Sequence, residues 1–214
     1  MTFRDRSEAG RKLAAALAGY KDQDPVVLAL PRGGVPVAAE IAAALDAPLD
    51  LLLVRKIGVP MQPELAMGAV VDGANPITVR NGDVIAAAGI SEETFARVCD
   101  RELAEIARRH RDYLGDRPAA EVAGKTAIVV DDGVATGATT RAALRAIRMR
   151  APKRLVLAVP VGPTETLEAL EADVDEVVCP ERHENFGAIG YFYEDFHQLE
   201  DADVIAILSR FPPN

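Results

Sequence analysis

The stretch that most constrains the fold is residues 125–148, which read KTAIVVDDGVATGATTRAALRAIR. Residues 127–130 are an unbroken apolar run, mostly β-branched, as expected of a strand buried on both faces of a parallel sheet. A loop of small residues follows, and from Thr139 or Thr140 onward apolar residues recur with helical spacing. A strand, a small-residue loop and a helix in this order predict one βα unit of an α/β fold.

The loop of this unit combines an anion site with two carboxylates. The first N–H groups of a helix lack intrahelical acceptors and carry the positive end of its dipole, and Gly137 and Ala138 let the backbone approach a phosphate closely. Three hydroxyl side chains can add hydrogen bonds: Thr136, Thr139 and Thr140. Asp131 and Asp132 would repel a phosphate but suit sugar hydroxyls or a divalent cation. A sugar phosphate with bound Mg²⁺ meets all these demands, whereas an ordinary turn, the alternative, needs only one Gly or Asn.

Residues 129–139, VVDDGVATGAT, resemble the signature with which type I phosphoribosyltransferases bind 5-phosphoribosyl 1-pyrophosphate (PRPP). The resemblance implies an α/β fold with a Rossmann-like, mostly parallel sheet flanked by helices and a small C-terminal hood. It implies that Asp131 and Asp132 hold the ribose hydroxyls and lie beside Mg²⁺, directly or through water. The 5′-phosphate would be bound by the residues that follow: Ala135, Thr136, Gly137, Ala138, Thr139 and Thr140. Residues 124–126, GKT, are similar to the end of a Walker A loop, but a strand follows them where a P-loop needs a helix.

Composition restricts the class of protein further. The 214 residues, about half of them hydrophobic, suffice for a single domain over residues 1–214, with residues 180–200 as the hood. The formal charge of −9 argues against a nucleic-acid-binding surface, which needs a basic face. Cys99 and Cys179 belong to no metal-ligand cluster and are expected to be free, buried thiols in a reducing cytosol. Neither a signal peptide nor an apolar run of membrane-spanning length is visible, so we expect a cytoplasmic protein without membrane contact.

A second candidate site follows the apolar strand predicted over residues 26–30. Arg32, Gly33 and Gly34 lie between this strand and a predicted helix, so they offer backbone N–H groups and a guanidinium to an anion. By itself the segment fits an ordinary βα turn equally well. In type I phosphoribosyltransferases a similar Arg-Gly-Gly run binds pyrophosphate, often with a cis non-proline peptide bond. The resemblance therefore implies pyrophosphate binding by these residues and a cis peptide at or next to Arg32.

Two cations, Arg55 and Lys56, end the strand predicted over residues 49–54. Ligand crevices of open α/β sheets lie at the carboxyl ends of strands, so both side chains are placed to face one, with a solvated basic turn as the alternative. The resemblance adds both to the pyrophosphate site. It also implies a mobile catalytic loop that begins at residues 58–64 and returns as a strand over residues 65–71. The catalytic residues that it implies are Arg32, Lys56, Asp131 and Asp132.

The rest of the chain alternates strands and helices, which predicts right-handed βαβ crossovers and a parallel sheet. Ser91 is expected to N-cap a long helix that runs to residue 113 and carries acidic residues in its first turn. Other helices are predicted over residues 4–20, from after Pro36 to residue 45, and over residues 82–88, 164–170 and 201–210, and other strands over residues 76–79, 154–159 and 174–179.

Residues 180–199 break this alternation and hold most of the aromatic residues. Flat rings on a loop can form a stacking platform for a nucleobase. In the resembled family a hood covers the base site, which implies base stacking by Phe186, Tyr191 and Phe192, with Tyr193 and Phe196 as weaker candidates. A local aromatic core or a dimer contact is an equal alternative.

The resemblance implies transfer of the phosphoribosyl group of PRPP to a nitrogen base, a purine rather than a pyrimidine, with release of pyrophosphate. A homodimer is the expected assembly. One departure counts against the hypoxanthine-guanine type, because Ala135 stands where some purine-salvage relatives place an Asp that can act as general base. Glu64 and Glu184 are the substitutes that the sequence offers.

Two other functions remain open. The absence of an Asp at position 135 leaves room for a non-catalytic PRPP- or nucleotide-sensing regulatory protein on the same fold. A hydrolase or kinase of sugar phosphates is disfavoured, because the sequence has neither a recognisable nucleophile constellation nor a P-loop.

Overall fold

A computed structural model of the protein describes residues 2–72 and 76–211. At its centre lies a five-stranded parallel sheet in the order β2-β1-β6-β7-β9. β6, which opens the sequence motif, is the middle strand and is buried along its whole length, as its apolar run predicted. The predicted α/β class with a mostly parallel sheet is confirmed. The five strands are β1 (Pro25–Ala29), β2 (Leu49–Leu51), β6 (Thr126–Val130), β7 (Arg154–Ala158) and β9 (Glu176–Val178).

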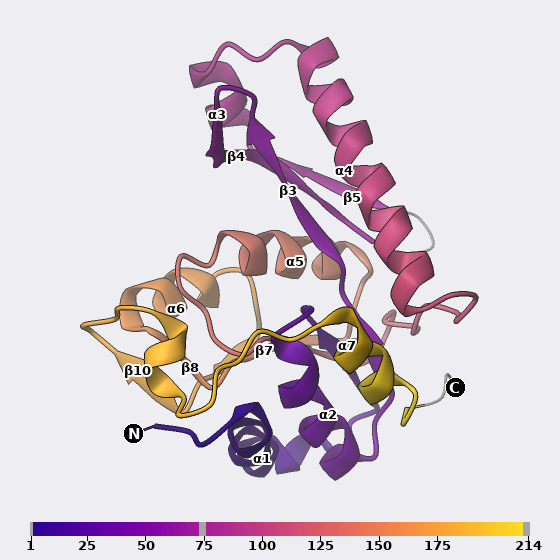
Figure 1. The fold of residues 1–214 in the computed structure, drawn as a ribbon, viewed down its shortest axis with the longest axis vertical. Coiled ribbons are helices and arrows are strands. Elements are labelled where there is room, and N and C mark those ends of the chain that lie inside the picture. Colours follow the sequence, from indigo (N-terminus) through magenta and orange to yellow (C-terminus); the bar gives the residue numbers. More distant parts are fainter. Residues whose placement is uncertain (1, 73–75, 212–214) are drawn as a thin grey trace.

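Helices cover both faces of this sheet (Figure 1). One face packs against α1 (Arg6–Ala16), α2 (Gly34–Leu45) and α7 (Asp201–Leu208), and the other against α5 (Ala138–Met149) and α6 (Thr164–Glu171). Successive residues of a strand point to opposite faces, so Ile128 and Val130 enter the first core while Ala127 and Val129 enter the second. The helix predicted over residues 4–20 is divided into α1 and the 3₁₀ turn η1 (Ala18–Tyr20).

A second, antiparallel sheet extends away from the central body, with the long helix α4 along it (Figure 1). Ile57 and Met67 of this sheet and Phe95 and Ile106 of α4 form its separate core. The sheet has the order β3-β4-β5, and the elements are β3 (Val54–Val59), β4 (Gln62–Val71), β5 (Ile77–Arg80), α3 (Gly82–Ala87) and α4 (Glu92–Tyr113). Ser91 caps α4 as predicted, since its side chain accepts a hydrogen bond from the Thr94 N–H.

Residues 58–64, expected as the start of a loop, lie instead at the tip of a hairpin, whereas the returning strand expected over residues 65–71 is confirmed as part of β4. β3 and β4 pair antiparallel through Val59 and Gln62, with irregular register on both sides of Gly58. The Gly/Pro-rich segment has no periodicity of its own, but pairing with the neighbouring strand satisfies its backbone, and bulges accommodate the irregular residues.

Two short strands that the sequence did not predict form the base of the hood. β8 (Val161–Pro163) pairs parallel with β10 (Glu181–His183), and the 3₁₀ turn η2 (Ile189–Phe192) follows. Phe3 forms an isolated bridge with Tyr193, which ties the N-terminal segment to the hood. The hood therefore packs on the start of the chain as well as on the sheet (Figure 1).

Cys99 and Cys179 are free thiols, as predicted. Cys99 is buried as expected, whereas Cys179 is only partly buried. Within residues 2–72 and 76–211, none of the helices combines the length and the hydropathy needed to cross a lipid bilayer.

Candidate active site at the carboxyl ends of β1 and β6

The two candidate motifs lie side by side because β1 and β6 are parallel neighbours. Their register pairs Ala29 with Val130, so both loops leave the same edge of the sheet. The Leu30 N–H donates to the Val130 carbonyl oxygen at 2.8 Å, which carries the pairing into the loops. The peptide bond between Pro31 and Arg32 is cis, which confirms the predicted geometry.

The paired glycines allow these loops to pack against each other. A Cβ atom on Gly33 would overlap the Asp132 carboxylate. A Cβ atom on Gly34 would lie 2.6 Å from the Val130 carbonyl oxygen and 2.9 Å from the Asp131 Cα. Both contacts of Gly34 are with backbone, which cannot rotate away as a side chain can. The close packing of the two loops therefore requires glycine at both positions.

We expect Gly34→Ala to lower the free energy of unfolding by about 1–3 kcal/mol, the usual cost of forcing extra atoms into a packed site. Urea denaturation measures this change. Gly19→Ala is the matched control, because a Cβ there meets nothing within 4 Å, and we expect it to stay within about 0.5 kcal/mol of wild type. Equal stability of the two variants would show that the two loops are not in close contact.

The second carboxylate of the motif is engaged by a residue that the sequence did not identify. The Arg6 Nε donates to the Asp132 Oδ2 at 2.8 Å, and both side chains are buried. The Arg6 Nη1 also donates to the His197 carbonyl oxygen at 3.0 Å, and the guanidinium lies 4.0 Å from the centre of the Phe196 ring. The Tyr193 hydroxyl donates to the Asp132 carbonyl oxygen at 2.6 Å. Asp132 thus joins α1 and the hood to the motif.

The predicted phosphate loop leads into α5, which starts at Ala138, slightly before the expected Thr139. Gly137 is the N-cap residue and has a φ of 72°, a left-handed conformation that favours glycine. Thr139 is exposed at the helix start, as are Ala135 and Thr136 before it. The Thr140 side chain is buried, so any contact that this residue makes with a phosphate must come from its backbone.

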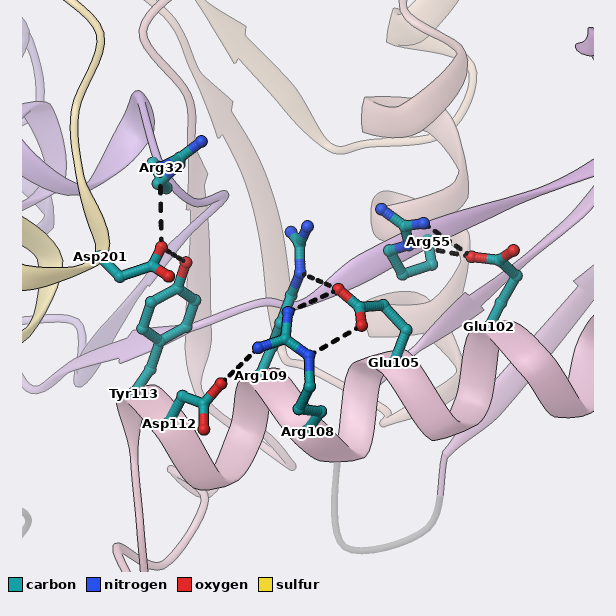
Figure 2. Close-up of polar contacts among 9 residues, drawn as sticks. All are labelled: Arg32, Arg55, Glu102, Glu105, Arg108, Arg109, Asp112, Tyr113 and Asp201. Carbon is teal, nitrogen blue, oxygen red and sulfur yellow. Dashed lines mark hydrogen bonds and ion pairs between the residues drawn. The ribbon is translucent and has the colours of Figure 1, made fainter.

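The predicted cations are held by carboxylates that come from other elements, as Figure 2 shows. The Arg55 Nη2 lies 2.9 Å from the Oε2 of Glu102, which is on α4. The Arg32 Nη1 lies 3.7 Å from the Oδ1 of Asp201, the first residue of α7, and the Tyr113 hydroxyl donates to the same Asp201 oxygen at 2.5 Å. Burial and this hydrogen bond raise the pKa of Tyr113 to about 12.

A small cavity of 70 Å³ brings the separate motifs together. It is lined by Pro31 of the Arg-Gly-Gly loop, Arg55 of β3, Asp131 after β6 and Thr139 of α5, together with Arg109 of α4. A larger cavity of 790 Å³ shares Val54, Arg55 and Thr139 with it and has several further cations in its lining: Lys56, Arg97 and Arg101. Arg55 and Asp131 thus line the same small cavity, whereas Lys56 lines the neighbouring larger one.

A third cavity, of 320 Å³, lies on the other side of the motif. Arg6, Arg32, Gly33 and Asp132 line it together with three residues that lead out of the hood: Phe196, Gln198 and Leu199. Each aspartate therefore lines a cavity: that of Asp131 is shared with β3 and α4, and that of Asp132 with the C-terminal segment.

Comparison with known proteins agrees with this geometry. A model of the phosphoribosyl transferase domain matches residues 5–197. The chain belongs to the phosphoribosyl transferase family.

Individual relatives support this membership. A Mycobacterium tuberculosis protein with the provisional name phosphoribosyl transferase is 44% identical over 208 residues, which cover 97% of this chain and 46% of that protein. The chain thus spans about half the length of the curated relatives that it matches. The crystal structure of TT1426 from Thermus thermophilus is 41% identical, with a TM-score of 0.87, and covers 99% of this chain and 100% of that one. The AQ2163 protein of Aquifex aeolicus shares the fold, with a TM-score of 0.51 at 14% identity. The match covers 86% of this chain and 78% of that one.

The two carboxylates of the motif have the chemistry expected of a shared magnesium site. Burial in the site, followed by the negative charge of Asp132, raises the pKa of Asp131 well above its usual range. A divalent cation would relieve this repulsion. Among the described residues no group of three or more His, Cys, Asp or Glu side chains could hold a metal alone. Two carboxylates fit Mg²⁺, which typically keeps waters and shares the oxygens of a bound phosphate.

The aromatic side chains of the hood pack mainly on one another. Phe186 and Phe192 stack with ring centres 5.2 Å apart, and both pack against a cluster that includes the buried Phe3 and Tyr193. This packing favours the aromatic-core alternative for those two residues. Tyr191 is 76% exposed, and base binding by Phe186, Tyr191 and Phe192 stays a prediction.

Of the two suggested substitutes for the missing Asp, the structure describes only the Glu184 side chain. Ala135 is exposed and its carbonyl oxygen accepts a hydrogen bond from the Thr166 hydroxyl at 2.9 Å. Glu184 is exposed on the hood. The Glu64 side chain lies outside the described residues.

Proposed function

We propose that this protein transfers the 5-phosphoribosyl group of PRPP to a nitrogen base, a purine in preference to a pyrimidine, and releases pyrophosphate. The observation that carries the proposal is the 70 Å³ cavity, in which Asp131, Arg55 and Thr139 meet the Arg-Gly-Gly loop. A carboxylate for ribose or metal, cations for pyrophosphate and a helix start for the 5′-phosphate are the three groups that PRPP requires.

In this proposal each part of the site has one task. The N–H groups from Ala135 to Thr140 bind the 5′-phosphate, and the Asp131 and Asp132 carboxylates hold the ribose hydroxyls and Mg²⁺. Bound Mg²⁺ would supply positive charge to the pyrophosphate. Arg32, Arg55, Lys56 and the Gly33-Gly34 backbone stabilise the negative charge that develops on pyrophosphate as it leaves the sugar.

The acceptor base would attack the C1 carbon of the ribose as its bond to pyrophosphate breaks. The proton that the base loses goes to solvent or to a group of the acceptor, because Ala135 supplies no carboxylate. Phe196, which lines the 320 Å³ cavity beside Asp132, is the hood ring best placed to contact an acceptor, in addition to the predicted Phe186, Tyr191 and Phe192. A homodimer in the cytoplasm remains part of the proposal.

A thermal-shift assay with PRPP and Mg²⁺ tests binding. A ligand at 100 times its Kd stabilises the native state by about 2.7 kcal/mol, which for a chain of this length raises Tm by about 5–10 °C. Release of pyrophosphate with a panel of bases then tests turnover. No shift with millimolar PRPP and Mg²⁺ would contradict the proposal.

The same assays separate transfer from the second candidate, a non-catalytic sensor. The observation in favour of a sensor is Ala135, which places no acid or base at that position. A thermal shift with PRPP, combined with no release of pyrophosphate for any purine or pyrimidine, would support the sensor.

A further inference from the structure

The 70 Å³ cavity has one cation that neither motif of the sequence supplies. Arg109, near the C-terminal end of α4, lines it together with Arg55, Pro31 and Asp131. In Figure 2 the Arg109 side chain rises from α4 with its two terminal nitrogens pointing away from the helix, between Arg32 on one side and Arg55 on the other.

Among the residues that the structure describes, Arg109 is hydrogen-bonded to a single carboxylate, and only through its Nε atom. The Arg109 Nε donates to the Glu105 Oε1 at 2.9 Å. Within the described part of the chain, no hydrogen bond occupies the Arg109 Nη1 or Nη2. Its neighbour Arg108 differs, because it donates from Nε and Nη2 to Glu105 and from Nη1 to the Asp112 Oδ2 at 2.6 Å. These bonds from Arg108 and Arg109 lower the pKa of Glu105 to about 2, so the carboxylate stays charged.

Three guanidinium groups of the site, two of which line this cavity, follow one arrangement. Asp201 pairs with Arg32, Glu102 with Arg55 and Glu105 with Arg109, so that each cation has one carboxylate partner (Figure 2). Glu102 and Glu105 are three positions apart on α4 and so share one face of the helix. Such pairs orient each cation before a ligand binds and offset the repulsion among the cations.

We propose that Arg109 is a further pyrophosphate-binding residue, which α4 carries to the site and Glu105 orients. The inference rests on the proposed use of PRPP. Its physical basis is the planar guanidinium, whose terminal N–H groups match two phosphate oxygens at once. Arg109 lines a cavity that is also lined by Arg55 and by Pro31 at the start of the Arg-Gly-Gly loop, and its terminal nitrogens point away from α4.

Calorimetry on the full chain, with three ligands, tests this role. For Arg109→Gln we expect the Kd for PRPP with Mg²⁺ and the Kd for inorganic pyrophosphate with Mg²⁺ to rise about tenfold. The Kd for ribose 5-phosphate, which lacks the pyrophosphate, should change less than twofold. Arg109→Lys should recover part of the loss, because it restores the charge without the planar fork. Arg108→Gln is the matched control, since it also removes bonds to Glu105 but does not line the cavity, and all three Kd values should stay within twofold of wild type.

Each outcome decides a separate question. If Arg109→Gln weakened the binding of all three ligands equally, or weakened it no more than Arg108→Gln does, the role of Arg109 would be overturned. The proposed function would remain intact. Absence of PRPP binding by the wild-type protein would instead overturn the proposed function, and this inference with it. Circular dichroism and Tm of each variant identify any loss of folding.

Discussion

Arg6→Met is expected to lower the free energy of unfolding by about 3–5 kcal/mol, because it leaves the buried Asp132 carboxylate without its partner. Arg6 and Asp132 are each 8% exposed, so little solvent can replace the lost charge. The variant also removes the hydrogen bond from Arg6 to the His197 carbonyl oxygen and the contact with Phe196, both of which hold the hood. Urea denaturation followed by circular dichroism measures the loss.

Two comparisons isolate the buried pair. Arg11→Met, also on α1, removes a more exposed pair with Glu40 at 3.3 Å and should cost less than about 1 kcal/mol. In the double variant Arg6→Met/Asp132→Asn, removal of the unpaired charge should restore at least about 1 kcal/mol relative to the sum of the single changes. A cost for Arg6→Met no larger than that for Arg11→Met would disprove the buried ion pair.

Asp131→Asn is expected to weaken PRPP–Mg²⁺ binding by about 2 kcal/mol, or roughly 30-fold, because it removes charge-assisted contacts with the ligand. The same change should leave the apoprotein as stable as wild type or more stable, because the ionised Asp131 is disfavoured by burial and by Asp132. Asp132→Asn should differ by weakening both binding and folding, since it leaves Arg6 buried without a partner. Isothermal calorimetry and urea denaturation measure the two effects.

The pH dependence of stability provides an independent check of Asp131. Its pKa is higher in the native state than the ordinary value of 3.8, so the native protein takes up this proton before the unfolded chain does. Above the raised pKa, the ionised Asp131 therefore lowers the stability of the native protein. This penalty decreases as the pH falls from the raised pKa toward 3.8, because the native carboxyl group becomes protonated. The stability advantage of Asp131→Asn over wild type should be larger at pH 7 than at pH 5. An advantage that does not change with pH would mean that Asp131 is not perturbed.

The candidate site could be located from the sequence because its key chemistry is local. A buried strand, a small-residue loop and a helix start are determined by neighbours along the chain, which is why the motif from Asp131 to Thr140 was predicted in its correct position. The Arg32-Gly33-Gly34 loop was predicted for the same reason, and the cis peptide followed from the family resemblance. The hairpin over β3 and β4 was mispredicted because a strand without periodicity is defined only by its pairing partner.

The sequence by itself determined the α/β class, the order of most elements and the two loops that meet at the sheet edge. Tertiary structure alone decided which charges pair: Arg6 reaches Asp132 across 126 positions and Arg55 reaches Glu102 across 47. It also decided that Arg109 of α4 lines the cavity beside Asp131, although its surroundings in the sequence resemble those of any solvated helix. The physical reason is that strand and helix patterns depend on neighbouring residues, whereas the partner of a charged side chain depends on how distant elements pack.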